Sequence, residues 1–225
     1  MPSKIPNVSP FEIKDCALIA LATGKRAQNL RELREHLNTI TSDSIYYHFW
    51  GTLLRPRFDD PEYHNDFSIW AAHDLHDKIL AERLAIIDPT EYRSLDELRF
   101  EIIEVIEERL DEVDYPIWAK SGAQFEFISS QIVIFNTNQT IAEPKEFVRV
   151  LPKMSVGSIF YHFIDSRRRT FDATDDFQNW LANFGSKYDV LIQQIREIDP
   201  YFSPLTELRV ELTKVFKNHF QEINK

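Results

Sequence analysis

The sequence predicts an all-α protein made of two tandem homologous helical repeats with about five helices each. The first observation is internal similarity, because residues 11–49 align without a gap with residues 125–163. The second is that apolar residues in both repeats recur at the spacings of three and four that mark amphipathic helices. The third is the content of only 5 glycines in 225 residues, which is low for a fold rich in tight hairpin turns.

Short motifs recur in the same order in both repeats. Residues 44–49 read Ser-Ile-Tyr-Tyr-His-Phe, and residues 158–163 read Ser-Ile-Phe-Tyr-His-Phe. The other matched landmarks are Asp66-Phe67-x-x-Trp70 with Asp176-Phe177-x-x-Trp180, Ile87-Asp88-Pro89 with Ile198-Asp199-Pro200, and Glu97-Leu98-Arg99 with Glu207-Leu208-Arg209. Such ordered self-similarity predicts a repeated structural unit.

These matches divide the chain into four segments. Residues 1–10 form an N-terminal tail, and residues 11–113 form the first helical repeat. Residues 114–123, which contain proline and glycine, form a linker. Residues 124–222 form the second helical repeat. The pattern leaves open whether the two repeats make one domain or two.

The opening segment of each repeat is compatible with a helix or a strand. Residues 125–135 are a short apolar run, and periodicity alone does not separate a buried strand from a buried helix there. The matching residues 15–22 contain alanines, which favour a helix. Because matched segments share a fold, we predict a helix for both. The alternative is an α+β fold with a short strand at the start of each repeat.

The remaining helices of the first repeat follow in order. Residues 29–37 and 44–54 predict two short helices, and residues 65–87 predict a longer helix that a proline ends. The last helix begins at Ser94, because Ser94 and Glu97 have the spacing of a capping box. The second repeat carries equivalent segments.

Charge, cysteine content and hydropathy exclude several classes of function. The formal net charge is -10, with 36 acidic against 26 basic residues, and such a surface repels nucleic acid. The single cysteine, Cys16, has no partner for an internal disulfide, as is typical of a reducing compartment. No apolar run has the roughly 18 residues of a membrane span. We therefore expect a cytoplasmic soluble protein that binds neither nucleic acid nor a membrane.

A face of tyrosine, histidine and arginine is the candidate ligand-binding site of each repeat. Its residues are Tyr47, His48 and Arg55 in the first repeat and Tyr161, His162 and Arg169 in the second. Their spacing brings them to one helical face, where they can hold an anion or a sugar hydroxyl, or place an imidazole beside a cation. The structural alternative is that the aromatic rings are core and that each histidine bonds a backbone carbonyl or Asp66 and Asp176.

We predict no metal and no cofactor, with one alternative for a metal. His73 and His76 lie one turn apart in the first repeat and, with His48, offer three nitrogen ligands for zinc. The second repeat has Asn183 and Ser186 in place of that pair, so such a site is not shared by the repeats. The sequence also lacks a phosphate-binding glycine loop and a Gly-x-Ser-x-Gly nucleophile motif.

The motif set resembles a known family. In order, the first repeat carries Ser-Ile-Tyr-Tyr-His-Phe, Asn-Asp-Phe-x-x-Trp, Leu-Ala-x-x-Ile-Asp-Pro and Leu-x-Glu-Leu-Arg. This set is similar to that of an uncharacterised prokaryotic family, the domain of unknown function 5752, with the motifs present here in two tandem copies. The resemblance implies a soluble prokaryotic protein and carries no activity, cofactor or catalytic residue.

Two functional hypotheses follow. The first is a non-enzymatic module for protein interaction, or for regulation or ligand sensing, with a protein partner or as a homodimer. The aromatic-rich repeats without a nucleophile–base pair favour it. The second is a small-ligand-binding protein or an enzyme that uses the two Tyr-His-Arg faces, with histidine as acid and base. Histidines that are buried and bonded to backbone would contradict the enzyme, so the exposure of His48 and His162 separates the two hypotheses.

Overall fold

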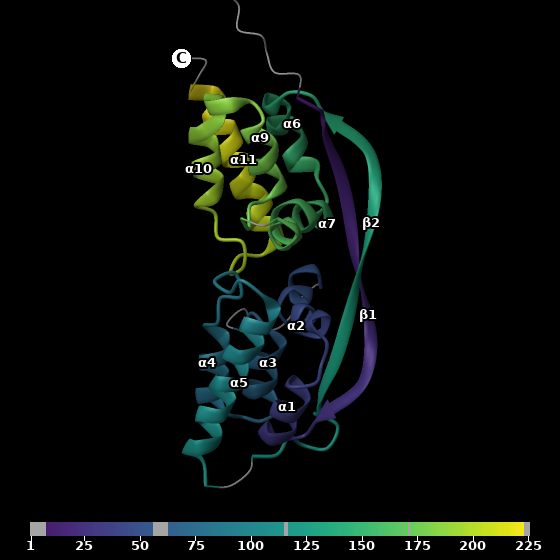
Figure 1. Cartoon of the computed structure of the whole chain (residues 1–225), viewed down its shortest axis with the longest axis vertical. Coiled ribbons are helices and arrows are strands. Elements are labelled where there is room, and N and C mark those ends of the chain that lie inside the picture. The colour runs from purple at the N-terminus through teal and green to yellow at the C-terminus, as the bar shows by residue number, and fades with distance from the viewer. Residues whose placement is uncertain (1–7, 56–62, 115–116, 171, 223–225) are drawn as a thin grey trace, which may run out of the picture. The chain divides into compact units, whose positions relative to one another are not determined.

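The protein combines helices with two long antiparallel strands (Figure 1). The computed structural model describes residues 8–55, 63–114, 117–170 and 172–222. The prediction of an all-α fold is therefore wrong, and the α+β alternative is the correct one.

The elements follow the chain in two similar series. The first series is β1 (Phe11–Ala27), α1 (Leu30–Leu37), α2 (Ser42–Leu54), α3 (Asp66–His73), α4 (Lys78–Ala85) and α5 (Leu95–Glu112). The second is β2 (Phe125–Ile141), η1 (Pro144–Glu146), α6 (Phe147–Val150), η2 (Leu151–Lys153), α7 (Val156–Ile159), η3 (Phe160–Asp165), α8 (Ser166–Arg169), α9 (Asp176–Ala182), η4 (Gly185–Tyr188), α10 (Asp189–Arg196) and α11 (Leu205–Glu222). Element η3 is a π-helix, and η1, η2 and η4 are 3-10 helices.

The helix predicted at 65–87 is two helices, α3 and α4. The chain turns between them at His76, whose φ of 57° lies in the left-handed region and cannot continue a right-handed helix. Asp77 then caps α4 by accepting the backbone N–H of Leu80. The predicted start of α5 is confirmed, because the Ser94 hydroxyl accepts the backbone N–H of Glu97.

Both opening segments are strands of 17 residues, not helices. Phe125 and Phe127 are buried while Glu126 between them is exposed, and β1 begins with the same pattern, with Phe11 and Ile13 buried. This alternation is the mark of a strand with one covered face. Alanine favours a helix, but intrinsic helix propensity contributes little free energy per residue, and pairing with the partner strand outweighs it.

The chain divides into two compact units that do not coincide with the two series of elements. Unit 1 comprises residues 1–17 and 133–225, and unit 2 comprises residues 18–132. Each strand therefore begins in one unit and ends in the other. The start of β1 belongs with the helices of the second series, and the start of β2 belongs with the helices of the first.

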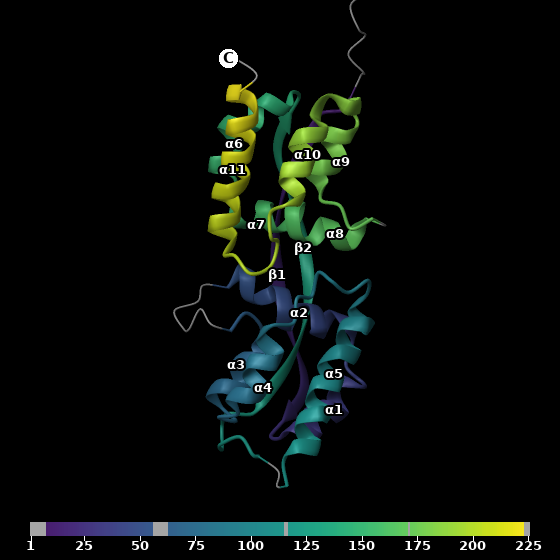
Figure 2. The same cartoon turned by 90° about the vertical axis from the view of Figure 1, so that its left-hand side faces the viewer.

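Aromatic rings at the start of each strand tie it to the helices of its unit. In unit 1, Phe11 stacks on Phe177 with a centroid distance of 5.4 Å and meets Phe147 edge-on. In unit 2, Phe125 stacks on Phe67 at 4.9 Å. Such rings bury large apolar areas, so these contacts form the core of each unit. In each unit, the helices lie on one side of the strands (Figures 1 and 2).

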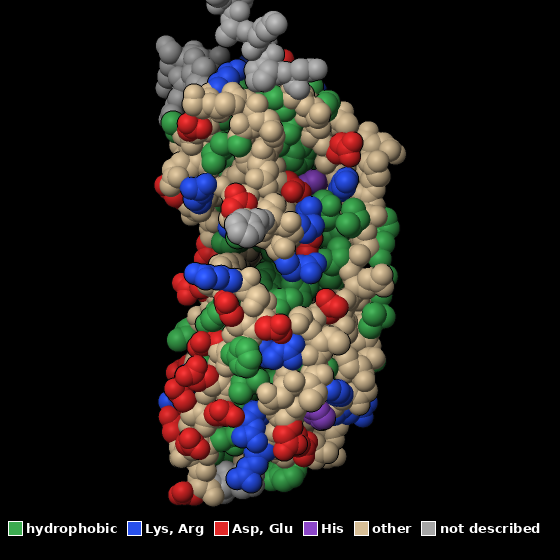
Figure 3. Space-filling view, viewed as in Figure 1, with side chains coloured by type: hydrophobic (Ala, Val, Ile, Leu, Met, Phe, Trp, Pro, Cys, Tyr) green, Lys and Arg blue, Asp and Glu red, His purple; other side chains and the backbone are tan. Residues whose placement is uncertain are grey.

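The surface is acidic over part of unit 2. Asp and Glu side chains gather over α4 and α5 (Figure 3), as expected from the α5 sequence LDELRFEIIEVIEERLDE. A face of this charge repels polyanions. In the described part of the chain, no helix combines the length and hydropathy needed to cross a membrane.

Candidate functional site

A buried histidine joins strand and helices in unit 1. His162 is 3% exposed, and its Nδ1 lies 2.7 Å from Oδ2 of Asp176. Its Nε2 accepts the backbone N–H of Lys14 at 2.9 Å. Because Nε2 accepts a hydrogen bond, it carries no proton. The ring proton is therefore on Nδ1, and this N–H donates a hydrogen bond to Asp176. The imidazole therefore bridges β1 and α9 through both of its ring nitrogens.

His48 makes the same two contacts in unit 2. Its Nδ1 lies 2.9 Å from Oδ2 of Asp66, and its Nε2 accepts the backbone N–H of Ile128 at 3.1 Å. Burial lowers the pKa of His48 below its usual value, although the neighbouring Asp66 opposes this shift. Burial alone would raise the pKa of Asp66, but the hydrogen bond and charge of His48, with those of Arg55, outweigh burial and lower it. The pair is thus a neutral histidine beside an ionised aspartate.

An arginine completes each cluster by bonding the same aspartate oxygen as the histidine. Arg169 Nη2 lies 3.1 Å from this oxygen, and its guanidinium carbon lies 4.2 Å from the ring centroid of Tyr161. In unit 2, Arg55 Nη2 lies 2.8 Å from the oxygen and the guanidinium carbon lies 4.7 Å from the ring of Tyr47. Both arginines thus combine an ion pair with a cation–π contact. The structure brings together all three residues of each predicted face.

The two clusters differ in the helix that carries the histidine. His48 lies on the regular helix α2, whereas His162 lies on the π-helix η3. π-Helical turns are rare and occur often at functional sites. The last residue of η3, Asp165, is buried and pairs with Arg169 at 3.1 Å, so Arg169 is held by two carboxylates. The matching residue in α2 is Gly51, which has no such side chain.

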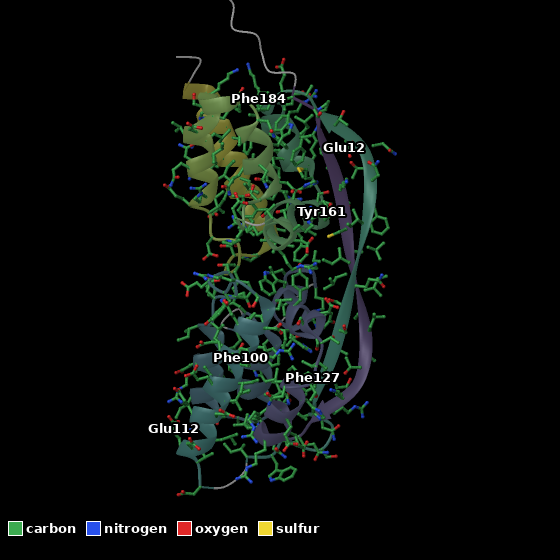
Figure 4. All side chains as sticks on the ribbon, viewed as in Figure 1. Glu12, Phe100, Glu112, Phe127, Tyr161 and Phe184 are labelled. Atoms are coloured by element: carbon green, nitrogen blue, oxygen red, sulfur yellow. The ribbon has the colours of Figure 1, made fainter. Side chains whose placement is uncertain are left out.

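Each cluster forms one wall of a pocket. The unit 1 pocket has a volume of about 330 Å³, and its lining, besides the cluster, includes Glu12, Lys14, Asn179 and Trp180. Figure 4 shows Glu12 on β1 and Tyr161 on η3 in this unit. The unit 2 pocket has a volume of about 220 Å³ and is lined, besides its cluster, by Ile69, Trp70, Asp74, Gln124, Phe125, Glu126 and Ile128.

The arrangement offers binding groups, but neither histidine is free to act as an acid–base catalyst. Both nitrogens of His162 and of His48 are already bonded, so neither ring presents a free lone pair to a substrate. Burial raises the pKa of Cys16 to about 12, so its thiol stays protonated and weakly nucleophilic. Both histidines are buried and bonded to backbone, which is the geometry that counts against the enzymatic hypothesis.

Comparison with known proteins places the fold. The sequence model of a family of unknown function (DUF5752) matches residues 8–217. The chain belongs to this family. A single match extends through both series of elements of the DUF5752 chain, so the family unit includes both strands and both sets of helices, and it does not appear as two separate copies.

A solved structure shares the DUF5752 architecture described above. The chain is similar to the structure of OrfY from Thermoproteus tenax, with a TM-score of 0.78 and 25% sequence identity over 93% of this chain and 95% of that chain. No protein with a curated description matches the sequence. The comparisons therefore support the fold and the family and assign no chemistry.

The alternative metal site is not assembled in this DUF5752 protein. His48 uses both ring nitrogens within its own cluster, while His73 and His76 are exposed. Among the residues that the structure describes, no group of three His, Cys, Asp or Glu side chains is placed to hold a metal ion.

The sequence predictions missed the contacts that anchor the segment before each strand beside the two sites. The indole N–H of Trp180 donates to the carbonyl of Ser9 at 2.8 Å, and that of Trp70 donates to the carbonyl of Ala123 at 2.8 Å. Each tryptophan of the Asp-Phe-x-x-Trp motif thus anchors the segment just before a strand, in addition to its core role. The signal available in the sequence was the matched Phe-Glu pair at residues 11–12 and 125–126.

Proposed function

We propose that this chain is a non-enzymatic ligand-sensing or regulatory module whose unit 1 pocket binds a small polar molecule. The observation that supports this proposal is the cluster of His162, Asp176 and Arg169. It forms a wall in which the histidine has no nitrogen left for acid–base catalysis but the charged rim faces a pocket. A pre-formed pocket with a few convergent polar groups is the usual form of a small-molecule site.

The charges of the unit 1 pocket indicate the class of ligand. Lys14 and Arg169 supply two positive charges, while Glu12 and Asp176 supply two negative ones. Such a balanced lining favours a molecule that is neutral overall, either polyhydroxylated or zwitterionic, over a polyanion. The amide of Asn179 adds hydrogen-bonding capacity for either.

The unit 2 pocket is less suited to this ligand. Ile128 and Ile69 lie where the unit 1 pocket has Lys14 and Asn179, so two polar groups are replaced by apolar ones. The lining of the unit 2 pocket is acidic, because it contains three carboxylates, those of Asp66, Asp74 and Glu126, and one cation, Arg55. We therefore place the ligand site in unit 1.

The test is a thermal-shift screen of the full chain against sugars, polyols and amino acids. A ligand that binds only the folded state must raise the melting temperature by mass action. Replacing Lys14→Ile and Asn179→Ile together gives the unit 1 pocket the apolar residues of unit 2, and we expect this variant to lose the shift. The control is Ile69→Asn, which gives the unit 2 pocket the residue that unit 1 has at the matching position. We expect this variant to retain the thermal shift. The absence of any shift, or an undiminished shift in the double variant, contradicts the proposal.

Exposed apolar side chains favour protein interaction as a second candidate function. Ile86 after α4 is 78% exposed and Phe100 of α5, labelled in Figure 4, is 67% exposed. Large exposed apolar residues close to a charged rim are common at protein interfaces. Light scattering of the chain and of Phe100→Asp tests self-association through Phe100. A mass that stays monomeric over a wide concentration range in both proteins contradicts a homodimer.

A further inference from the structure

A larger pocket in unit 1 takes no part in the site above. It has a volume of about 430 Å³ and lies among β1, β2 and the segment from α6 to α7. The lining groups able to recognise a ligand are Asp15, Gln139, Arg149, Lys153, Ser155 and Ser158.

Two cations at this pocket have no fixed counter-charge. Arg149 of α6 and Lys153 of η2 lie one turn apart and are exposed, and neither forms an ion pair with any residue that the structure describes. Asp15 is the carboxylate of the lining, and its Oδ1 already accepts the backbone N–H of Cys16 at 2.8 Å. The pocket therefore has an excess of positive charge in a chain whose formal net charge is -10.

Two serine hydroxyls that line the same pocket have one hydroxyl proton that is not used in their mutual hydrogen bond. The Oγ of Ser155 lies 3.0 Å from the Oγ of Ser158 and also accepts the backbone N–H of Ser158 at 2.9 Å. The two hydroxyls carry two protons, and their mutual hydrogen bond uses one of them. Ser158 is 2% exposed, so the second proton is held in a position with little access to bulk water. A buried hydroxyl of this kind is a ready donor to a ligand.

The corresponding surface in unit 2 has hydroxyls at the matching positions, Thr41 and Ser44, but lacks the two cations. Glu35 and Thr39 occupy the positions of Arg149 and Lys153, so the first cation is replaced by a carboxylate. The nearby Lys25 donates to the carbonyl and the hydroxyl of Thr39 at 3.3 and 2.7 Å and is thus already engaged. At these matched positions, the two cations without an ion pair are present in unit 1 and absent from unit 2.

We propose that this pocket binds the phosphate group of a small phosphorylated molecule. The guanidinium of Arg149 and the ammonium of Lys153 contact the phosphate oxygens, and the Ser155–Ser158 pair donates a hydrogen bond to the same group. The volume exceeds what a phosphate needs, and Asp15 and Gln139 are in position to contact hydroxyl groups of the remainder of the molecule. This site is independent of the neutral-ligand pocket beside His162.

The test is calorimetric titration of the full chain with inorganic phosphate and, separately, with glycerol phosphate. Saturable binding of either is expected, and tighter binding of the ester shows that the organic part is also recognised. The variant Arg149→Ala/Lys153→Ala should weaken binding at least about tenfold, because charge-assisted hydrogen bonds are lost. Lys153→Thr, which introduces the residue of unit 2, is the milder second variant and should weaken binding by a smaller factor.

The matched control is Lys145→Ala, which removes the same charge from an exposed residue of unit 1 outside the pocket. Binding should stay within about twofold of the wild-type value, since a distant surface charge is screened. Sodium chloride at equal ionic strength separates site binding from general screening of the protein's charges. Equal weakening by Lys145→Ala, full binding in the double variant, or a heat of titration that never saturates would overturn the proposal.

Discussion

The backbone amide of Lys14 donates a hydrogen bond to Nε2 of His162 over 2.9 Å, although 148 residues separate the two in sequence. Ile128 and His48 repeat this relationship in unit 2 at 3.1 Å. In each case an imidazole from one series of elements holds the strand of the other series. A buried backbone N–H that loses its acceptor costs about 1–3 kcal/mol. These two contacts are therefore expected to fix the register of the strands on the helices.

Replacing His162 tests the value of this contact. His162→Phe keeps the aromatic volume but leaves the amide of Lys14 without its acceptor and removes the histidine N–H from Asp176, which keeps its ion pair with Arg169. We expect a loss of about 2–4 kcal/mol in the free energy of unfolding. His162→Gln can present an acceptor close to the position of Nε2, so its loss should be clearly smaller. Urea denaturation measures both values. Equal losses in the two variants would show that ring packing, and not the hydrogen bond, is what matters.

The pKa of His48 predicts a dependence of stability on pH. Burial places the folded-state pKa below the ordinary value of 6.5, so the unfolded chain binds a proton first as the pH falls. Stability should thus be unaffected by this group above about pH 6.5 and should decline below it, because a protonated Nε2 would oppose the amide of Ile128. Unfolding measured between pH 5 and 8 should show this decline in the wild type and a flatter profile in His48→Gln. A wild-type profile identical to that of the variant contradicts the assignment.

Asp175 predicts the opposite trend. Burial raises its pKa to about 6, so the folded state holds a proton more tightly than the unfolded chain, and stability falls as the pH rises from about 4 to 6. Asp175 caps α9 by accepting the backbone N–H of Gln178 at 2.9 Å, and Asn65 caps α3 in the same way without a charge. Asp175→Asn should keep the cap and raise the free energy of unfolding at pH 7.5 by about 1–3 kcal/mol.

The gain from Asp175→Asn should vanish near pH 4, where the wild-type carboxyl is already neutral in the folded state. The reverse exchange, Asn65→Asp, places a charge in the equivalent cap and removes the donor that Asn65 offers to the carbonyl of Leu84 at 2.8 Å. It should lower stability at pH 7.5. A destabilised Asp175→Asn variant at pH 7.5 would show that the ionised carboxylate is needed there, for example by Arg167 at 3.5 Å.

The division of each strand between two units predicts the behaviour of a split chain. A fragment of residues 1–113 lacks Phe125 and Phe127, which cover its helices, and a fragment of residues 117–225 lacks Phe11. Each fragment alone leaves an aromatic core open to water, so we expect it to be unfolded or aggregated. Expressed together they should form a soluble heterodimer with the circular dichroism spectrum of the intact chain. Cooperative unfolding of either fragment as a monomer contradicts this expectation.

Several features could be predicted from local sequence because their physics is local. Helix α1 lies where residues 29–37 predict it, and Ser94 begins α5 because a hydroxyl three residues before an N–H is within its reach. Tyr161, His162 and Arg169 come together for a related reason, since their spacing brings them to one side of a helical segment. Several of the helices and the composition of the candidate clusters could therefore be predicted from the sequence.

The two strands could not be predicted from the local sequence. The run around Cys16 contains alanines that favour a helix when considered alone, and only pairing with β2 makes the extended form the more stable one. The turn at His76 was missed for a similar reason, because a positive φ at a non-glycine residue is stable only when its surroundings hold it.

The sequence by itself determined the positions of α1, α2 and α5, the Ser94 cap, the acidic charge and the two Tyr-His-Arg faces. The helix positions, the cap and the two faces each depend on residues within a few turns of one another, and the charge depends on composition alone. Only the tertiary structure decided that β1 begins in unit 1 and β2 in unit 2, and that Lys14 and Ile128 supply the partners of the two histidines. A hydrogen bond across 148 residues leaves no periodic trace in the sequence, because its geometry arises from the packing of strands on helices.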